Sequence, residues 1–343
     1  MGKIDHKKHL GVALIGAGMI AKTHIAALSE LQDNVRLKAI VSRHPERAAP
    51  LAADYAGPPL TFTSDLDAVA TDPDIHFAII ATPPNVRRSV IEVLARNGKH
   101  ILLEKPVGRT YDEAADVVTL CDKAGVSLGV VFQHRMRASA LAAAKHVAGG
   151  KLGRLGLVEI AVPLWRDQSY YDTLGRGTYA RDGGGVMLTN AIHSIDLALS
   201  LTGPVTCVQA MTATTPLHQM EAEDFATAGL HFACGAVGSF VAGTAMFPHR
   251  TEVIRLHFEH GSLRIDKDAL GIDWRDGRHV VEGPLPSAKH EWHQAVIADF
   301  VKAVQKGTRP FVTGHDALAS HRLIQAIEVS SKSGRSVDLA HLR

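Results

Sequence analysis

The sequence predicts an α/β protein with two domains: a doubly wound parallel sheet at the N-terminus and an α+β domain with an open, mostly antiparallel sheet after it. Three observations support this. The 343 residues exceed what one hydrophobic core usually supports. Strand-like and helix-like segments alternate through the first third of the chain. After about His134, longer strand-like runs follow one another with short turns between them.

The first domain is expected to contain buried strands, because its short apolar runs are bounded by turn residues. These runs are Gly11–Ile15, Leu37–Val41, Ile75–Ala81, His100–Leu103 and Val126–Phe132. The helical stretches between them are Ile20–Leu31, Pro45–Tyr55, Val86–Asn97 and Tyr111–Ala124. Strands and helices at this spacing predict a Rossmann dinucleotide-binding domain over residues 1–133.

Residues 134–343 are expected to form the α+β domain, which would bind substrate and contact other subunits. Its predicted strands are Leu155–Pro163, Val205–Thr212, Ala226–Phe232, Ala236–Thr244, Thr251–His257 and Gly261–Ile265. Two helices, Glu291–Gln305 and Gly314–Ser331, close the chain. The prediction allows this C-terminal segment to pack back on the first domain.

The composition argues against several classes of function. The formal net charge is +2 and no long basic run is present, so a nucleic-acid partner is not expected. No segment has the roughly 20 apolar residues that a membrane span needs, and the charged N-terminus lacks the apolar stretch that is typical of a signal peptide. The three cysteines never occur as C-x-x-C, and the 20 histidines form no metal-binding spacing. We therefore expect a cytoplasmic protein without a metal site.

A glycine-rich loop follows the first predicted strand and opens a helix, in the segment Val12-Ala13-Leu14-Ile15-Gly16-Ala17-Gly18-Met19-Ile20-Ala21. Gly16 would permit a tight turn, Gly18 would let the backbone approach a pyrophosphate, and Ala21 would keep the helix close to the sheet. Together with Met19 and Ile20, these residues are predicted to hold the phosphates at the helix N-terminus.

The end of the second predicted strand favours NADP over NAD. An NAD site usually carries an acidic residue here for the ribose hydroxyls, whereas this strand ends in Ser42 and Arg43. Ser42 can hydrogen-bond, and Arg43 can pair with a 2′-phosphate. In the alternative, Arg43 stacks on the adenine or faces solvent, and the cofactor is NAD.

Four short motifs carry a resemblance to a known family. They are Ala81-Thr82-Pro83-Pro84-Asn85, Leu103-Glu104-Lys105-Pro106, Gly183-Gly184-Gly185 and Ile192-His193-Ser194-Ile195-Asp196. With them, the chain resembles the Gfo/Idh/MocA oxidoreductase family from about Leu10 to Leu339. The resemblance implies sugar, inositol or related polyol substrates, and oligomer contacts through the open sheet of the second domain. A homodimer or homotetramer is therefore expected.

The resemblance also implies the residues around the nicotinamide. It places Asn85 on the nicotinamide ribose, after a turn shaped by Pro83 and Pro84, and makes Lys105 the catalytic lysine. Ala81, Thr82 and Pro83 are also expected to contact the cofactor. An ammonium beside a cationic ring loses solvation and feels a like charge, so its pKa would fall toward acid–base use. Glu104 is expected to position Lys105. In the alternative, Lys105 is a solvated charge at a strand end.

His193 is predicted to accept the substrate's hydroxyl proton while Lys105 hydrogen-bonds the same oxygen. On an ideal helix, Gly185, Thr189, His193 and Asp196 share a polar stripe beside an apolar face. In the alternative, His193 is a core residue. Asp196 would either orient the imidazole or pair with a surface group.

This chain departs from the family pattern at two positions. Many members carry Asp or Asn four residues before the histidine, where this chain has Thr189. We expect Thr189 to be the third catalytic group, because the neighbouring Asn190 would point about 60° away from His193. The second departure is Arg87, which stands where a histidine is expected and has no assigned role.

The segment from Trp165 to Asp182 is predicted to bind the substrate, because aromatic faces and hydrogen-bonding side chains suit a polyhydroxylated ring. The expected contacts are Trp165, Arg166, Tyr170, Arg181, Asn190 and His193. The surplus of arginines, which includes Arg176, points to an anionic substrate such as a sugar acid. In the alternative, the segment is an ion-paired loop at a subunit contact.

Taken together, these features predict an NAD(P)-dependent dehydrogenase of a monosaccharide, inositol or sugar acid. Two alternatives stay open. One is a glycoside hydrolase that oxidises and re-reduces its sugar with a tightly held NAD. The other is a non-catalytic dinucleotide-binding protein.

Overall fold

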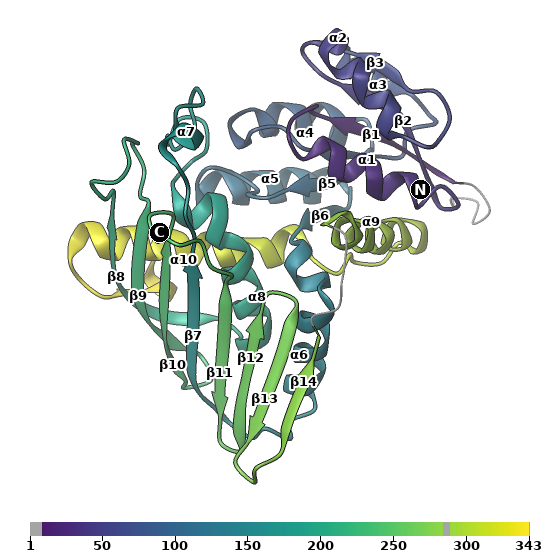
Figure 1. Cartoon of the computed structure of the whole chain (residues 1–343). Helices are drawn as coiled ribbons and strands as arrows, with labels where there is room; N and C mark the ends of the chain where they lie inside the picture. The colour runs from purple at the N-terminus through teal and green to yellow at the C-terminus, as the bar shows by residue number, and fades with distance from the viewer. Residues whose placement is uncertain (1–8, 284–288, 343) are drawn as a thin grey trace. The chain divides into compact units, whose positions relative to one another are not determined.

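The computed structural model describes residues 9–283 and 289–342 (Figure 1). The chain forms two compact units, each built from separate stretches of sequence. Unit 1 comprises Met1–Gly108, Asp112–Gln133 and Ser287–Ala317. Unit 2 comprises Arg109–Tyr111, His134–Pro286 and Leu318–Arg343. One stretch of the C-terminal part of the chain therefore belongs to the first unit.

Unit 1 contains a six-stranded sheet in the order β3-β2-β1-β4-β5-β6, with every neighbouring pair parallel. The strands are β1 (Leu10–Ile15), β2 (Val35–Val41), β3 (Thr61–Thr63), β4 (Phe77–Ile80), β5 (His100–Glu104) and β6 (Leu128–Val131). This confirms the predicted doubly wound sheet. The chain order reverses between β1 and β4, where folds of this kind bind their ligands. Strand β3 was not predicted, because its three residues are not buried.

The helices of unit 1 largely match the predicted segments. They are α1 (Ala21–Ser29), α2 (Pro45–Ala48), α3 (Leu66–Thr71), α4 (Arg87–Arg96), α5 (Tyr111–Ala124) and α9 (Lys289–Lys306). The single helix expected over Pro45–Tyr55 is wrong, since α2 gives way to a 3₁₀ helix at Ala49–Asp54. Pro50 explains the break, because it lacks an N–H and its ring clashes with the preceding turn of an α-helix.

Helix α9 completes the core of unit 1, although it lies far from the other elements in sequence. Its Phe300 packs on Phe77 of β4, with ring centroids 5.4 Å apart. Gly129 of β6 makes room for this ring, since a Cβ there would lie 2.6 Å from it. Helix α9 also contacts α1. The sheet is therefore covered partly by residues from the last sixth of the chain.

Unit 2 contains a nine-stranded sheet in the order β14-β13-β12-β11-β7-β10-β9-β8-β15. Among the described strand pairs of this second sheet, only β7 and β10 are parallel, which confirms the predicted mostly antiparallel sheet. Strands β13, β14 and β15 were not predicted. The strands are β7 (Leu155–Pro163), β8 (Val205–Ala213), β9 (Phe225–Phe232), β10 (Val237–Gly243), β11 (Val253–Phe258), β12 (Gly261–Asp266), β13 (Ala269–Trp274), β14 (His279–Glu282) and β15 (Val337–Asp338).

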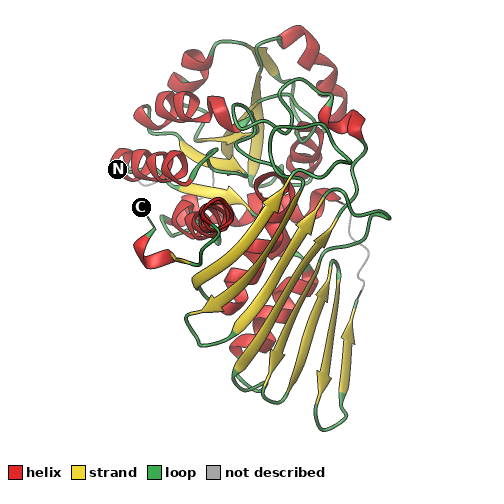
Figure 2. Ribbon diagram, turned by 90° about the vertical axis from the view of Figure 1, so that its left-hand side faces the viewer, coloured by secondary structure: helices red, strands yellow, loops and turns green. Residues whose placement is uncertain are grey.

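The three longer helices of unit 2 lie along one face of its sheet (Figure 2). Helix α6 (Ala138–Ala148) contacts β12 and β13, and α8 (Ile192–Thr202) contacts β7. The short α7 (Gln168–Tyr171) follows β7, and most of α10 (Gly314–Ser333) belongs to this unit. Within the described residues, no helix combines the length and hydrophobicity that crossing a membrane requires.

Candidate functional site

The glycine-rich loop of unit 1 follows β1 and leads into α1. Gly16 has a φ of +108°, and a Cβ there would lie 3.0 Å from the backbone of Ala81. Only glycine suits this combination of conformation and contact. A Cβ at Gly18 would have nothing within 4 Å, and the neighbouring Met19 is 82% exposed. The loop is thus tight where it meets the sheet and open at Gly18, as close approach of a phosphate requires.

The other predicted cofactor residues follow the carboxyl ends of the strands beside this loop. Because the strands are parallel, these ends lie on one edge of the sheet. Gly16, Gly18, Met19 and Ile20 follow β1, Ser42 and Arg43 follow β2, Ala81, Thr82, Pro83 and Asn85 follow β4, and Glu104 and Lys105 lie at the end of β5.

The end of β2 leaves its arginine available. The Ser42 N–H donates to the Thr63 carbonyl (2.9 Å), and the Ser42 hydroxyl accepts from the His44 N–H (3.2 Å). Arg43 is exposed and forms no ion pair within residues 9–283 and 289–342. Its guanidinium is therefore open to a ligand.

Arg87 is a buried cation that connects the loops after β4 and β5. It is only 4% exposed. Its Nε donates to the Thr82 carbonyl (2.9 Å), Nη1 donates to the carbonyls of Glu104 and Pro106, and Nη2 lies 3.5 Å from the Lys105 carbonyl. Burial lowers its pKa to about 10, while the charge of Glu104 acts in the opposite direction. Arg87 thus holds the backbone on both sides of Lys105, a role that its sequence position alone did not show.

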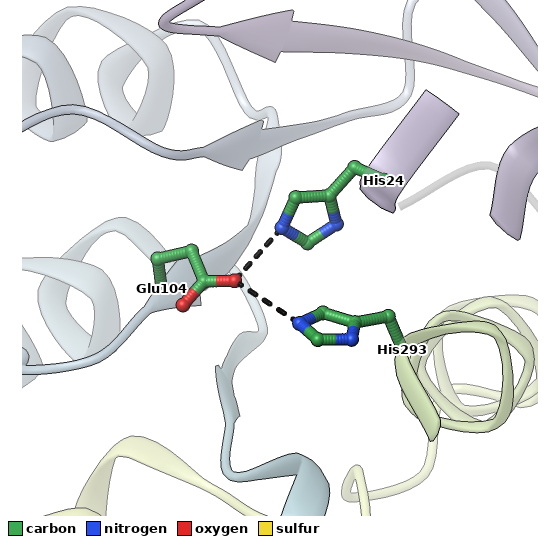
Figure 3. A group of neighbouring side chains, drawn as sticks. All are labelled: His24, Glu104 and His293. Atoms are coloured by element: carbon green, nitrogen blue, oxygen red, sulfur yellow. Dashed lines mark hydrogen bonds and ion pairs between the residues drawn. The ribbon is translucent and has the colours of Figure 1, made fainter. Parts of the chain in front are cut away.

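The Glu104 side chain is held by two histidines from different helices (Figure 3). His24 of α1 donates from Nε2 to Glu104 Oε1 (2.8 Å), and Nε2 of His293 from α9 lies 3.7 Å from the same oxygen. The two imidazole rings meet edge to face, with centroids 5.2 Å apart. All three side chains are buried. This cluster could not be predicted from the sequence, because its members lie far apart along the chain.

Positive groups around Glu104 offset the cost of burying its carboxylate. Burial by itself would raise the pKa of Glu104, but the His24 hydrogen bond and the charges of His24, His293 and Lys105 outweigh it and bring the pKa to about 2. The ligand atoms of His24, Glu104 and His293 all lie within 4.8 Å of one another, so they could contact one metal ion. However, Lys105 and Arg87 would repel a divalent cation there. The arrangement therefore suits an anchor for the Lys105 segment better than a metal centre.

His193 lies in unit 2, near the start of α8, and is 7% exposed. Its ring stacks on that of His134, with centroids 4.4 Å apart. His134 in turn accepts from Arg137 Nη2 at 2.7 Å. The imidazole thus has a defined orientation, stacked on a ring that Arg137 also contacts.

The helical stripe expected around His193 is wrong in its geometry. Met187–Ala191 form a π-helical turn, and Gly185 precedes the helix. Hydrogen bonds in a π turn span five residues instead of four, so the rotation per residue differs from the 100° of an α-helix. The predicted angle between Asn190 and His193 therefore does not apply. Turns of this kind often occur at functional sites.

Thr189, Asn190 and Asp196 make contacts that the stripe did not predict. The Thr189 hydroxyl lies 2.6 Å from the Gly185 carbonyl and 2.9 Å from Asn190 Oδ1. Asp196 forms a bidentate ion pair with Arg135, at 2.7 and 2.6 Å. Because Asp196 is buried, the alternative in which it pairs with a surface group is wrong.

The start of the π turn is held by Glu223, which sequence reasoning missed. Its carboxylate accepts from the Gly185 N–H (2.9 Å) and the Met187 N–H (3.0 Å), and its carbonyl accepts from Val186 (2.8 Å). A Cβ at Gly185 would lie 1.7 Å from the Glu223 carbonyl oxygen. Burial raises the pKa of Glu223. Burial and the charge of Glu223 together raise the pKa of Glu328 to about 7.

The predicted substrate segment of unit 2 is only partly ion-paired. Arg181 Nη1 lies 3.3 Å from Asp182 Oδ1, which agrees with the alternative of an ion-paired loop. Trp165 packs edge to face on Phe247, with centroids 5.5 Å apart. Tyr170, in contrast, is contacted by two arginines, Arg166 and Arg176.

Comparison with protein families agrees with this architecture. Residues 10–132 match a model described as "Oxidoreductase family, NAD-binding Rossmann fold". Residues 140–264 match the "GFO/IDH/MocA C-terminal domain". The two matches together cover most of the chain and fall on its parallel and its mixed sheet.

Several characterised proteins are similar over almost the whole chain. The D-apiose dehydrogenase of Paraburkholderia graminis is 27% identical, over 96% of this chain and 90% of its own. The WlbA dehydrogenase from Bordetella pertussis, solved with NADH and UDP-GlcNAcA, has a TM-score of 0.84 at 28% identity and covers 96% of this chain and 99% of its own. Levoglucosan dehydrogenase, solved with NADH and levoglucosan, has a TM-score of 0.87 at 26% identity, covering 97% of this chain and all of its own. The chain belongs to the Gfo/Idh/MocA oxidoreductase family.

Proposed function

We propose that the protein is an NAD(P)-dependent dehydrogenase that moves a hydride between a nicotinamide and a hydroxyl or carbonyl of a monosaccharide, inositol or sugar acid. The observation that carries this proposal is the anchored Lys105 segment on the same sheet edge as the open glycine loop. The cluster around Glu104 and the Arg87 contacts hold that segment from both sides. The sugar and nucleotide-sugar ligands of the similar proteins support the substrate class.

The residues at this edge fit a dinucleotide. The space at Gly18 suits the pyrophosphate, and Thr82 Oγ1 is a buried hydroxyl without a hydrogen-bond partner in the described part of the chain. Ser42 and Arg43 would take the adenosine ribose, with Asn85 on the nicotinamide ribose. When bound, the nicotinamide supplies the hydride acceptor, or the donor in the reverse direction.

Each proton-handling residue is proposed from its own surroundings. Lys105 would donate a hydrogen bond to the reacting oxygen and favour its alkoxide character. His193 would accept the hydroxyl proton, since imidazole is the side chain most often used for general acid–base catalysis. Thr189 would contact a substrate hydroxyl.

A screen of both cofactors against a panel of sugars, inositols and sugar acids tests the proposal. We expect at least one substrate to change the near-ultraviolet absorbance of the nicotinamide continuously. Release of a sugar from a glycoside without net absorbance change would instead indicate the hydrolase alternative. Tight cofactor binding with no reaction across the panel would indicate a non-catalytic binding protein.

The role of His193 is tested with the best substrate from this screen. We expect His193→Asn to lower kcat about 10²–10⁴-fold, the usual contribution of general acid–base catalysis, and to remove one limb of the pH–rate profile. His279→Asn is the control, because His279 is exposed at a sheet edge and pairs with Asp273. An unchanged pH profile in His193→Asn would exclude His193 as the base.

A further inference from the structure

Two arginines of unit 2 lie against the same aromatic ring. The guanidinium carbon of Arg176 is 4.5 Å from the centroid of Tyr170, and that of Arg166 is 5.3 Å away. Arg176 Nη1 also donates to the Tyr170 hydroxyl at 2.8 Å. Contacts between arginine and an aromatic face orient the guanidinium groups but leave their positive charge in place.

The carboxylates of the surrounding segments are all engaged with other groups. Asp167 accepts from Trp165 Nε1, Asp172 from Gln168 Nε2, Asp182 from the Gly177 N–H while it pairs with Arg181, and Asp224 from His218 and Thr215. None of the described acidic side chains lies within ion-pair distance of Arg166 or Arg176. The segment thus contains two arginines that its own acids do not neutralise.

The unsatisfied donors of these arginines are partly shielded from water. In both Arg166 and Arg176, Nε is buried and has no hydrogen-bond acceptor among residues 9–283 and 289–342. Arg166 has only a long contact to the Trp165 carbonyl, 3.4 Å from Nη1. Shielded cations and unpaired donors near one another are costly unless an anion binds to them.

The backbone of Arg166 is fixed before any ligand arrives. Its N–H donates to the Thr244 carbonyl (2.9 Å), and its carbonyl accepts from His218 Nε2 (2.8 Å). His218 is itself buried and donates from Nδ1 to the buried Asp224 (2.7 Å). A rigid backbone lowers the entropic cost of placing the guanidinium on a ligand.

We infer that Arg166, Arg176 and Tyr170 form a subsite for an oxyanion of the substrate, either a carboxylate or a phosphate. The planar donor groups of arginine match both oxyanions, with two parallel hydrogen bonds in the best geometry. This inference rests on the proposed function and narrows its substrate class to anionic sugars. It does not depend on the identity of the catalytic groups.

Isothermal titration in the presence of NADH or NADPH tests the subsite with three probes. D-glucuronate carries a carboxylate, D-glucose 6-phosphate carries a phosphate, and D-glucose carries neither. We expect at least one anionic probe to bind about tenfold or more tightly than glucose, as charge-assisted hydrogen bonds give. The preference should shrink as salt is added. The anion that binds more tightly shows whether the subsite prefers the carboxylate of a sugar acid or the phosphate of a sugar phosphate.

The variants Arg166→Gln and Arg176→Gln assign the preference to these residues. Each should lose about tenfold or more in affinity for the anionic probe and keep the wild-type affinity for glucose. Arg176→Lys should recover only part of the loss, because an ammonium keeps the charge without the planar donor pair. The matched control is Arg278→Gln, since Arg278 also lies over a ring, that of Trp274 (4.6 Å), but pairs with Asp276 (2.7 Å).

Two outcomes would overturn the inference. Equal affinity of the wild type for glucose and both anions would remove the subsite. Equal losses for glucose and the anion in the variants, with unchanged melting temperatures, would make the arginines packing residues. The proposed function would survive either result if neutral sugars still reduce the cofactor. If arginine-dependent anion binding is found but no sugar reacts with either cofactor, the subsite stands and the dehydrogenase proposal fails.

Discussion

The two units hold their candidate reactive segments with buried ions of opposite sign. In unit 1, the Arg87 guanidinium donates to carbonyl groups on both sides of Lys105. In unit 2, the Glu223 carboxylate accepts from N–H groups at the start of the π turn that leads to His193. Both ions are almost fully buried.

The difference follows from which backbone groups each segment leaves unpaired. A chain that leaves the end of a strand presents carbonyls without ladder partners, whereas the first turn of a helix presents free N–H groups. Buried backbone groups need partners, so the first segment requires a donor and the second an acceptor. The sign of the buried ion is therefore set by the local secondary structure.

The largest expected effect tests whether the segment held by Arg87 carries the chemistry. Lys105→Ala should lower kcat about 10³-fold or more, which corresponds to roughly 4 kcal/mol, and should change cofactor affinity little. Steady-state kinetics and fluorescence titration with the reduced cofactor would measure both. Lys38→Ala, an exposed lysine of β2 near Asp74, is the control. Wild-type rates in Lys105→Ala would remove that residue from the mechanism.

Loss of the buried cation itself should be the next largest effect. Arg87→Met leaves the carbonyls of Thr82, Glu104 and Pro106 without this donor, so the free energy of unfolding should fall by about 3 kcal/mol. Denaturant unfolding would measure the change. Arg88→Met is the control, because Arg88 is exposed and its ion pairs with Asp116 and Glu92 are worth little. Similar losses in both variants would show that Arg87 is no more important than a surface charge.

A second arginine of unit 1 should act on ligand binding instead of stability. Arg43→Ala should weaken NADP(H) more than NAD(H) by about 1–3 kcal/mol, the scale of a charge-assisted hydrogen bond. Unfolding should be unchanged, because Arg43 is exposed and unpaired within the described residues. Arg36→Ala, at the opposite end of β2, serves as the control. Equal weakening of both cofactors would contradict the NADP preference.

The smallest expected effect concerns Glu328, the acidic residue of unit 2 that feels the charge of Glu223. The pKa of Glu328 is raised from 4.5 to about 7, so the folded chain binds this proton more tightly than the unfolded chain. The contribution of Glu328 to stability therefore falls as pH rises from about 4.5 to 7 and stays low above that. Glu328→Gln should be more stable than the wild type at pH 8 by about 1–2 kcal/mol, after allowance for solvent screening.

The Glu328 experiment requires unfolding curves at several pH values. The gain of Glu328→Gln should vanish near pH 4.5, where the carboxyl is protonated in both states. Glu92→Gln provides the control, since Glu92 is exposed in an ion pair with Arg88. A gain that does not vary with pH would show that proton binding is not its cause.

The order of strands and helices and the short motifs could be predicted, because they depend on residues that are close in sequence. The alternation of apolar runs and helices predicted the parallel sheet, and the loop at Gly16 and the Glu104-Lys105 segment were recognisable as motifs. The contacts that hold the Glu104-Lys105 segment were not predictable, because Arg87 and His293 reach it through tertiary contacts. The same is true of Glu223, which holds the start of the π turn. The π turn before His193 also has no signal in residue spacing, since its neighbours fit an α-helix equally well.

The return of α9 to unit 1 has a consequence for the order in which the chain can fold during synthesis. A ribosome that has made only the first 133 residues has not yet made Phe300, which covers Phe77, or His293, which lies beside Glu104. The parallel sheet can begin to form, but one part of its apolar surface stays uncovered until unit 2 has almost been translated. Both units therefore reach completion at nearly the same time, and until then the nascent first unit exposes apolar surface of the kind that promotes aggregation.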